Sequence, residues 1–142
     1  MSRTIYIDVL EKEQIERYEK AGISVKSPKE VFELELKKED SLIVLCELNV
    51  GEKDENVNRN DFYGVQLIKN LRLKNNFSGN VLFLSNLERS YFLNKNSLKF
   101  SLVGIERGHS FLQLPVTPME MKNSLEKTVK LDELSFKDLK WF

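Results

Sequence analysis

The sequence is poor in the residues that build disulfide or metal-held scaffolds. Its 142 residues include one cysteine, Cys46, and one histidine, His109. A single cysteine excludes an internal disulfide framework and a cysteine-based zinc site, and no second histidine stands at ligand spacing. We therefore expect no metal site.

The chain also has no excess of positive or negative charge and no long apolar run. Lys plus Arg and Asp plus Glu number 22 each, so no global basic field is available to hold nucleic acid. The N-terminal "MSRTIYIDVLEKEQ" carries charges within and just after its only apolar run, unlike a signal peptide. No later run approaches the roughly 18 apolar residues of a membrane span. We expect a cytoplasmic protein that binds neither nucleic acid nor membrane.

Familiar catalytic motifs are absent as well. The chain has no Ser-His-Asp order, no Walker loop and no dinucleotide-binding fingerprint. The expectation is a protein that is not an enzyme and carries no cofactor.

What the sequence does contain is a regular alternation of strands and helices. Apolar or β-branched runs predict five strands, at 4–10, 23–26, 41–50, 80–85 and 110–115, with helical spacing between them and after the last. Ser27-Pro28 predicts the start of a helix that continues through Leu34 to Leu36, and Thr117-Pro118 predicts the start of the last helix. Such alternation is typical of an α/β fold, with a parallel sheet and helices on both faces. The length and the 41% hydrophobic content suit one domain, predicted at 1–130, with a tail at 131–142.

The segments "YIDV", "LIVLCELNV", "YGVQLIKNLR", "VLFLSN" and "GHSFLQLP" follow one another in this order. Together they resemble the receiver domain of two-component response regulators, over roughly Thr4 to Lys130. The resemblance implies a bacterial signalling protein with a CheY-like, flavodoxin-like fold. That fold is a three-layer α/β/α sandwich around a five-stranded parallel sheet.

The resemblance also implies positions for chemistry. An active receiver has two acids after the first strand that hold Mg²⁺, and an aspartate after the third that accepts the phosphoryl group. It has Ser or Thr after the fourth strand and a Lys-Pro pair after the fifth. Here Asp8 is followed by Val9, Glu47 stands at the acceptor position, Ser85 matches the hydroxyl, and Leu114 replaces the lysine. Phe111 matches the aromatic residue that switches rotamer in the family.

These departures predict a degenerate site. Phosphoryl transfer depends on positioning and on neutralising the charge of the phosphoryl oxygens. Val9 removes a metal ligand, Leu114 removes a cation, and the extra methylene of Glu47 displaces its carboxylate. We expect a pseudo-receiver, a non-enzymatic signalling or protein-interaction module. Two alternatives stay open: an atypical receiver that is still phosphorylated with Mg²⁺, and a flavodoxin-like domain that binds a small ligand at the strand ends.

Each of these residues also has a purely structural explanation. Glu47 could be a polar strand end, with or without a role as a phosphate mimic, and Ser85 could bond nearby backbone. Phe111 could be static core, and Cys46 should be a buried, inert thiol.

Aromatic residues near the C-terminus suggest a surface for a protein partner or a second copy of the chain. Tyr91, Phe92 and Phe100 precede the last strand, where an exposed apolar patch would mark an interface. The alternative is that they fill core beneath a remodelled helix. The tail, "LSFKDLKWF", should pack on the domain or act as a linker or docking segment.

Overall fold

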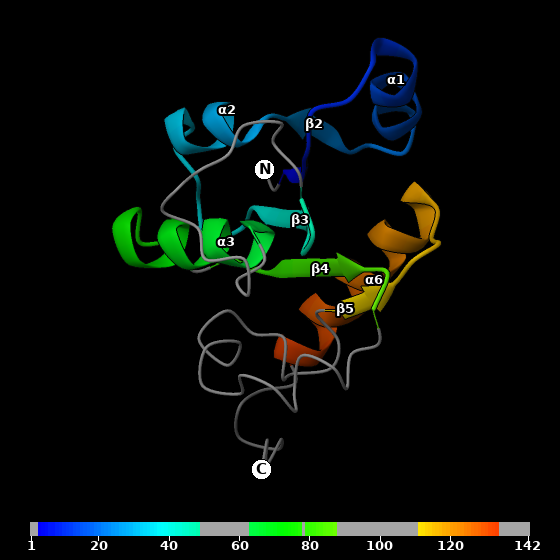
Figure 1. Cartoon of the computed structure of the whole chain (residues 1–142). Helices are drawn as coiled ribbons and strands as arrows, with labels where there is room; N and C mark the ends of the chain where they lie inside the picture. Colours follow the sequence, from blue (N-terminus) through cyan, green and yellow to red (C-terminus); the bar gives the residue numbers. More distant parts are fainter. Residues whose placement is uncertain (1–2, 49–62, 78, 88–110, 134–142) are drawn as a thin grey trace.

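The computed structural model describes residues 3–48, 63–77, 79–87 and 111–133, with side chains described up to residue 126. These residues form five strands and four helices (Figure 1). In chain order they are β1 (Thr4–Ile7), α1 (Lys12–Lys20), β2 (Ser24–Lys26), α2 (Pro28–Glu33), β3 (Ser41–Leu45), α3 (Tyr63–Lys74), β4 (Val81–Ser85), β5 (Phe111–Gln113) and α6 (Pro118–Glu133).

The five strands make one parallel sheet in the order β2-β1-β3-β4-β5. β3 lies at its centre, and Ile43 is opposite Tyr6 of β1 on one side and Leu82 of β4 on the other. The first four residues of β3 are buried, as a continuous apolar run covered on both faces requires. The predicted five-stranded parallel sheet is confirmed.

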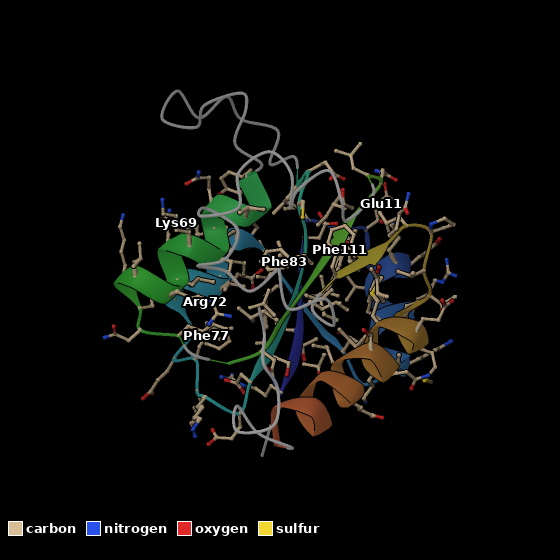
Figure 2. All side chains as sticks on the ribbon, turned by 90° about the horizontal axis from the view of Figure 1, so that it is seen from below. Glu11, Lys69, Arg72, Phe77, Phe83 and Phe111 are labelled. Atoms are coloured by element: carbon tan, nitrogen blue, oxygen red, sulfur yellow. The ribbon has the colours of Figure 1, made fainter. Side chains whose placement is uncertain are left out.

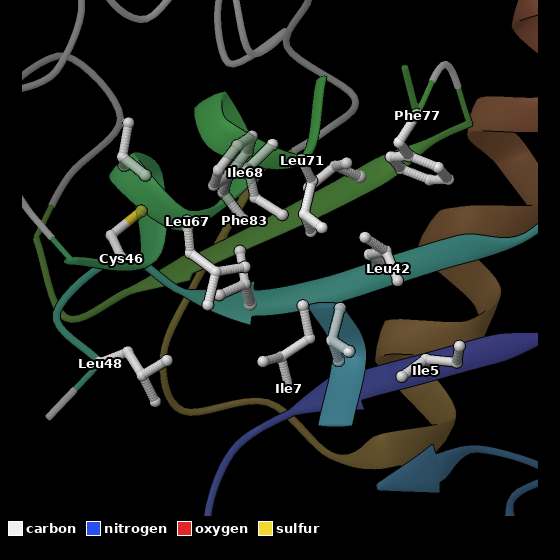
Figure 3. Close-up of a cluster of buried hydrophobic side chains, with 14 of the residues drawn as sticks. Ile5, Ile7, Leu42, Cys46, Leu48, Leu67, Ile68, Leu71, Phe77 and Phe83 are labelled. Atoms are coloured by element: carbon white, nitrogen blue, oxygen red, sulfur yellow. The ribbon is translucent and has the colours of Figure 1, made fainter. Parts of the chain in front are cut away.

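Successive side chains of each strand enter two different cores, because strand side chains alternate between the faces of a sheet. One core lies under α2 and α3 and includes Ile5, Leu42 and Phe83 (Figure 3). The other lies under α1 and α6 and includes Tyr6 and Ile43. The helices therefore cover both faces, as expected of three layers.

Local capping explains where two of the helices begin. The Ser27 hydroxyl accepts a hydrogen bond from Glu30 N (3.2 Å), and the Glu30 carboxylate accepts one from Ser27 N (3.0 Å). Thr117 and Glu120 make the same reciprocal pair at the start of α6. These side chains satisfy amide groups that have no partner inside the first turn. The predicted helix starts at Ser27-Pro28 and Thr117-Pro118 are confirmed.

The turn between α3 and β4 is fastened by an arginine. The Arg72 guanidinium lies 5.7 Å from the centre of the Phe77 ring and donates to the carbonyl oxygens of Phe77 (3.4 Å) and Gly79 (3.2 Å). Figure 2 shows Arg72 and Phe77 at this end of the molecule. The contacts hold the chain as it enters β4.

Element boundaries differ from the expectation in several places. β1 and β3 end at Ile7 and Leu45, earlier than predicted, because the chain leaves the sheet where the carboxyl-edge loops begin. α2 ends at Glu33, and Leu34 is already extended, although it still packs against the first core. α6 runs to Glu133, so the expected domain boundary at 130 falls inside this helix.

The segment between β4 and β5, at 88–110, lies outside the described residues, as does the chain after Glu133. Among the helices described, none has the length and apolar character needed to cross a membrane.

Candidate functional site

The predicted site residues follow the ends of four strands that share one edge of the sheet. Asp8 follows β1, Glu47 follows β3, Ser85 ends β4 and Leu114 follows β5. Parallel pairing brings these strand ends to the same side, and Leu114 N donates to Ser85 O at 2.8 Å. This carboxyl edge is where α/β folds ordinarily place their functional groups.

Glu47 and Ser85 are in direct contact. The Ser85 hydroxyl donates to Glu47 Oε1, and Asn86 N donates to Glu47 Oε2 at 3.2 Å. Ser85 is completely buried, and its hydroxyl oxygen also accepts a hydrogen bond from Leu87 N at 3.0 Å. Ser85 therefore bonds nearby backbone, as its structural explanation anticipated, and at the same time binds the acid of the neighbouring strand.

The reach of Glu47 depends on the backbone around it. Cys46 N donates to Leu84 O at 2.7 Å, which extends the pairing of the two strands by one step before the chain turns. From that turn the Glu47 side chain crosses to the end of β4. Cys46 itself is buried, as predicted, and both its burial and the adjacent Glu47 carboxylate raise the pKa of its thiol. A thiol held in its protonated form is a poor nucleophile.

Asp8 has hydrogen-bond partners of its own, different from those of Glu47. Its Oδ2 accepts a hydrogen bond from the Tyr6 hydroxyl at 3.1 Å, and its Oδ1 accepts one from Val9 N at 2.7 Å. Val9 has 66% of its surface exposed and offers no ligand atom in its side chain.

These residues do not fit the Mg²⁺ site of an active receiver. Magnesium needs oxygen ligands in near-octahedral geometry, and the family's site takes two acids after the first strand. Each carboxylate oxygen of Asp8 and Glu47 accepts one hydrogen bond from the protein, which leaves it a lone pair, but Val9 offers no second acid beside Asp8. Within the described parts of the chain, no three His, Cys, Asp or Glu side chains gather as a metal site would require.

Leu114 has become part of the hydrophobic core. Its side chain is partly buried and packs, with that of Val116, against the core beneath α1 and α6. The Leu114-Pro115 peptide bond is cis. The position that the resemblance assigns to a cation thus supplies apolar contact.

Phe111 lies opposite Phe83 across the pairing of β4 and β5 (Figure 2). It is buried, with 7% of its surface exposed, and belongs to the core beneath α2 and α3. The structure contains this aromatic residue in its inward position. Its predicted role as a switch stays a prediction.

Two residues of the site were missed by sequence reasoning. Gln113 Nε2 donates to Asn86 O at 3.3 Å, which ties β5 to the loop after β4. Nothing in the local pattern signals this bond, because its acceptor is the backbone carbonyl of a residue that follows another strand.

The residues predicted for an interaction surface, Tyr91, Phe92 and Phe100, lie outside the described residues.

Neither a family model nor a curated protein matches the chain. Among solved structures, a fusion that carries the yeast Spc42 trimeric coiled coil matches with a TM-score of 0.55 and 17% identity, over 94% of this chain and 80% of that one. The chemotaxis response regulator CheY4 of Vibrio cholerae matches with a TM-score of 0.51 and 15% identity, over 92% of this chain and 98% of its own. At these identities the likeness concerns the fold alone. Together with the five-stranded parallel sheet, it shows that the chain has a flavodoxin-like α/β architecture that fits the CheY-like receiver fold.

Proposed function

We propose that this protein is a non-enzymatic signalling module of receiver-like fold, which binds a protein partner or a second copy of itself and is not phosphorylated at its strand-edge acid. The observation that carries the proposal is the engagement of Glu47. Both of its carboxylate oxygens accept hydrogen bonds, one from the Ser85 hydroxyl and one from Asn86 N.

The chemistry of phosphoryl transfer explains why this arrangement is unfavourable for catalysis. The attacking carboxylate oxygen needs a free lone pair directed at phosphorus, and the charge on the phosphoryl oxygens needs cations placed in advance. Here the Ser85 hydroxyl, which by resemblance would bind a phosphoryl oxygen, donates to Glu47 instead, and the side chain at position 114 packs against the core. Val9 adds no ligand for a metal that would otherwise supply positive charge.

The same contacts favour a binding role. Glu47, which follows β3, bonds Ser85 and Asn86 at the end of β4, and Gln113 of β5 bonds Asn86. Ser85 and Asn86 are therefore held in place without any added phosphoryl group. A partner that contacts this edge would meet these two residues already positioned. Regulation would then come from the amount of protein or of partner. We place this activity in the cytoplasm.

The direct test is chemical phosphorylation. The protein would be incubated with acetyl phosphate and Mg²⁺ and its intact mass followed, with an active receiver domain in a parallel reaction to verify the reagent. We expect no phosphoryl adduct. A matched variant with Val9→Asp, Glu47→Asp and Leu114→Lys restores the acid pair, the acceptor and the cation, and shows whether these three positions account for the loss.

A stoichiometric, Mg²⁺-dependent adduct on the natural chain would contradict the proposal and favour the atypical but active receiver. Light scattering over a concentration series would distinguish self-association from binding of another protein. A rise in melting temperature with a small metabolite, in the absence of any protein partner, would instead favour a ligand-binding domain.

A further inference from the structure

Helix α1 is attached to the sheet by few contacts. None of its residues is buried, and its inward side chains, Ile15 and Tyr18, are only half-buried. One of these contacts is a ring stack. The Tyr18 ring lies on the Tyr6 ring of β1 with their centres 4.6 Å apart and their planes within 11° of parallel. Such aromatic pairs contribute beyond the area that they bury.

The Tyr6 ring is in turn held at its hydroxyl. Tyr6 has 6% of its surface exposed, and its hydroxyl donates to Asp8 Oδ2 at 3.1 Å. Burial raises the pKa of Tyr6, and the neighbouring Tyr18 and Asp8 raise it further. The hydroxyl therefore stays protonated and remains a donor. Without Asp8, this largely buried hydroxyl would lose that acceptor and be left with the neighbouring Tyr18 hydroxyl as a hydrogen-bond partner.

The second oxygen of Asp8 holds the chain that leads into α1. Asp8 Oδ1 accepts from Val9 N at 2.7 Å, at the first step of the β1–α1 loop. The far end of α1 is held separately, by a hydrogen bond of 3.0 Å from Lys122 Nζ of α6 to Ala21 O. Gly22, with a φ of 81°, leaves room for that lysine.

We propose that Asp8 is a positioning residue that orients the Tyr6 ring through its hydroxyl and thereby fixes α1 on the sheet by the Tyr6–Tyr18 stack. The acid that would serve metal binding in an active receiver acts here as the anchor of a helix. This role does not depend on whether the protein is phosphorylated. It differs from a purely local role, in which Asp8 would only order the loop through Val9 N.

Hydrogen exchange of the whole 142-residue chain tests the proposal. Asp8→Ala and Tyr6→Phe should each speed exchange of the α1 amides about fivefold, the effect of losing one ordinary hydrogen bond. The double variant should exchange no faster than Asp8→Ala alone, because both changes remove the same hydrogen bond between Tyr6 and Asp8. Asp8→Asn keeps an acceptor oxygen and should restore most of the protection. Exposed Glu16, in the middle of the same helix, provides the control, Glu16→Gln, which should change exchange little.

A second measurement reads the ring stack itself. In a Tyr18→Leu background the stack is gone, so Asp8→Ala should no longer alter exchange in α1. Near-ultraviolet circular dichroism of the tyrosines should change in Asp8→Ala and be restored in Asp8→Asn. Unchanged exchange of α1 in the nearly isosteric Tyr6→Phe would overturn the proposal. Additive effects of Asp8→Ala and Tyr6→Phe would overturn it as well, in favour of the local role at Val9.

Discussion

Asp40 is a buried carboxylate at the edge of the sheet opposite the candidate site. It accepts hydrogen bonds from Arg3 N (3.1 Å), Arg3 Nε (3.2 Å), Arg3 Nη2 (2.8 Å) and Lys37 N (2.8 Å). Its side chain is fully buried, whereas that of Arg3 is 41% exposed. These bonds join the start of β1 to the loop before β3. The Asp40 side chain therefore links two chain segments at this edge of the sheet.

The charge of Asp40 makes stability depend on pH. Burial alone would raise the pKa of Asp40, but hydrogen bonds from the Arg3 side chain and from the backbone of Lys37 and Arg3 outweigh burial and hold the pKa below its usual value. A lowered folded-state pKa stabilises the protein above the unfolded-state value, and that contribution is lost as the pH falls through the folded-state value.

Replacing Asp40 should therefore reduce stability at neutral pH more than in acid. We expect Asp40→Asn to lower the free energy of unfolding by about 2 kcal/mol at pH 7. Hydrogen bonds to a charged group contribute this much, and the exposure of the Arg3 side chain keeps the value from being larger. Urea titrations at neutral and acid pH measure both values. Exposed Glu39→Gln is the control. An equal loss at both pH values would show that charge is not the cause.

At the scale of elements, α3 owes its position to a glycine. Gly64 lies in the first turn of α3, where its N–H donates to Cys46 O at 3.1 Å. A Cβ at this position would clash with Leu45 O and lie 2.9 Å from the carbonyl carbon of Leu45. Figure 3 shows this helix lying against the end of β3 beside Cys46. Only glycine, which has no side chain, lets the start of α3 come this close to the Leu45 carbonyl group.

Gly64→Ala should accordingly destabilise the protein although alanine is the better helix former. The helix preference favours alanine by up to about 1 kcal/mol. Overpacking against backbone costs about 1–3 kcal/mol, because backbone atoms cannot move aside as a flexible side chain does. We expect a lower midpoint in urea. Leu73→Ala, at a position 65% exposed in the same helix, should leave the midpoint nearly unchanged. A stabilised Gly64→Ala protein would refute the close approach.

For the whole molecule, Phe83 of β4 connects the layers. It is fully buried, lies opposite Phe111 and shares a core with side chains of α3 (Figures 2 and 3). Since β4 pairs with both β3 and β5, a cavity at this position weakens several elements together.

Phe83→Ala should cost about 3–5 kcal/mol, a large share of the roughly 5–15 kcal/mol that stabilises an ordinary domain. Phe83→Leu leaves a smaller cavity and should cost less. Phe32→Ala, at a position 38% exposed on α2, provides the surface control. Thermal and urea unfolding followed by circular dichroism would rank the three variants. Similar losses in Phe83→Ala and Phe32→Ala would contradict the central place of Phe83.

The sequence by itself determined the order and type of most elements. The run from Ser41 predicted the central strand because continuous apolar residues suit a strand buried on both faces. Ser27 and Thr117 marked helix starts because capping is a local interaction among four residues. Local patterns were less exact about ends, as at Leu34 and after Ile7, because the end of pairing depends on neighbouring strands.

The tertiary structure alone decided what the site residues do. Glu47 and Ser85 are 38 residues apart, and Arg3 and Asp40 are 37 apart, so no local pattern pairs them. The resemblance to receivers predicted that Asp8 and Glu47 stand at one edge of the sheet. It did not predict that Asp8 binds Tyr6 or that Glu47 binds Ser85. Those partners depend on the reach and rotamer of each side chain, which are set only when the strands are packed in register.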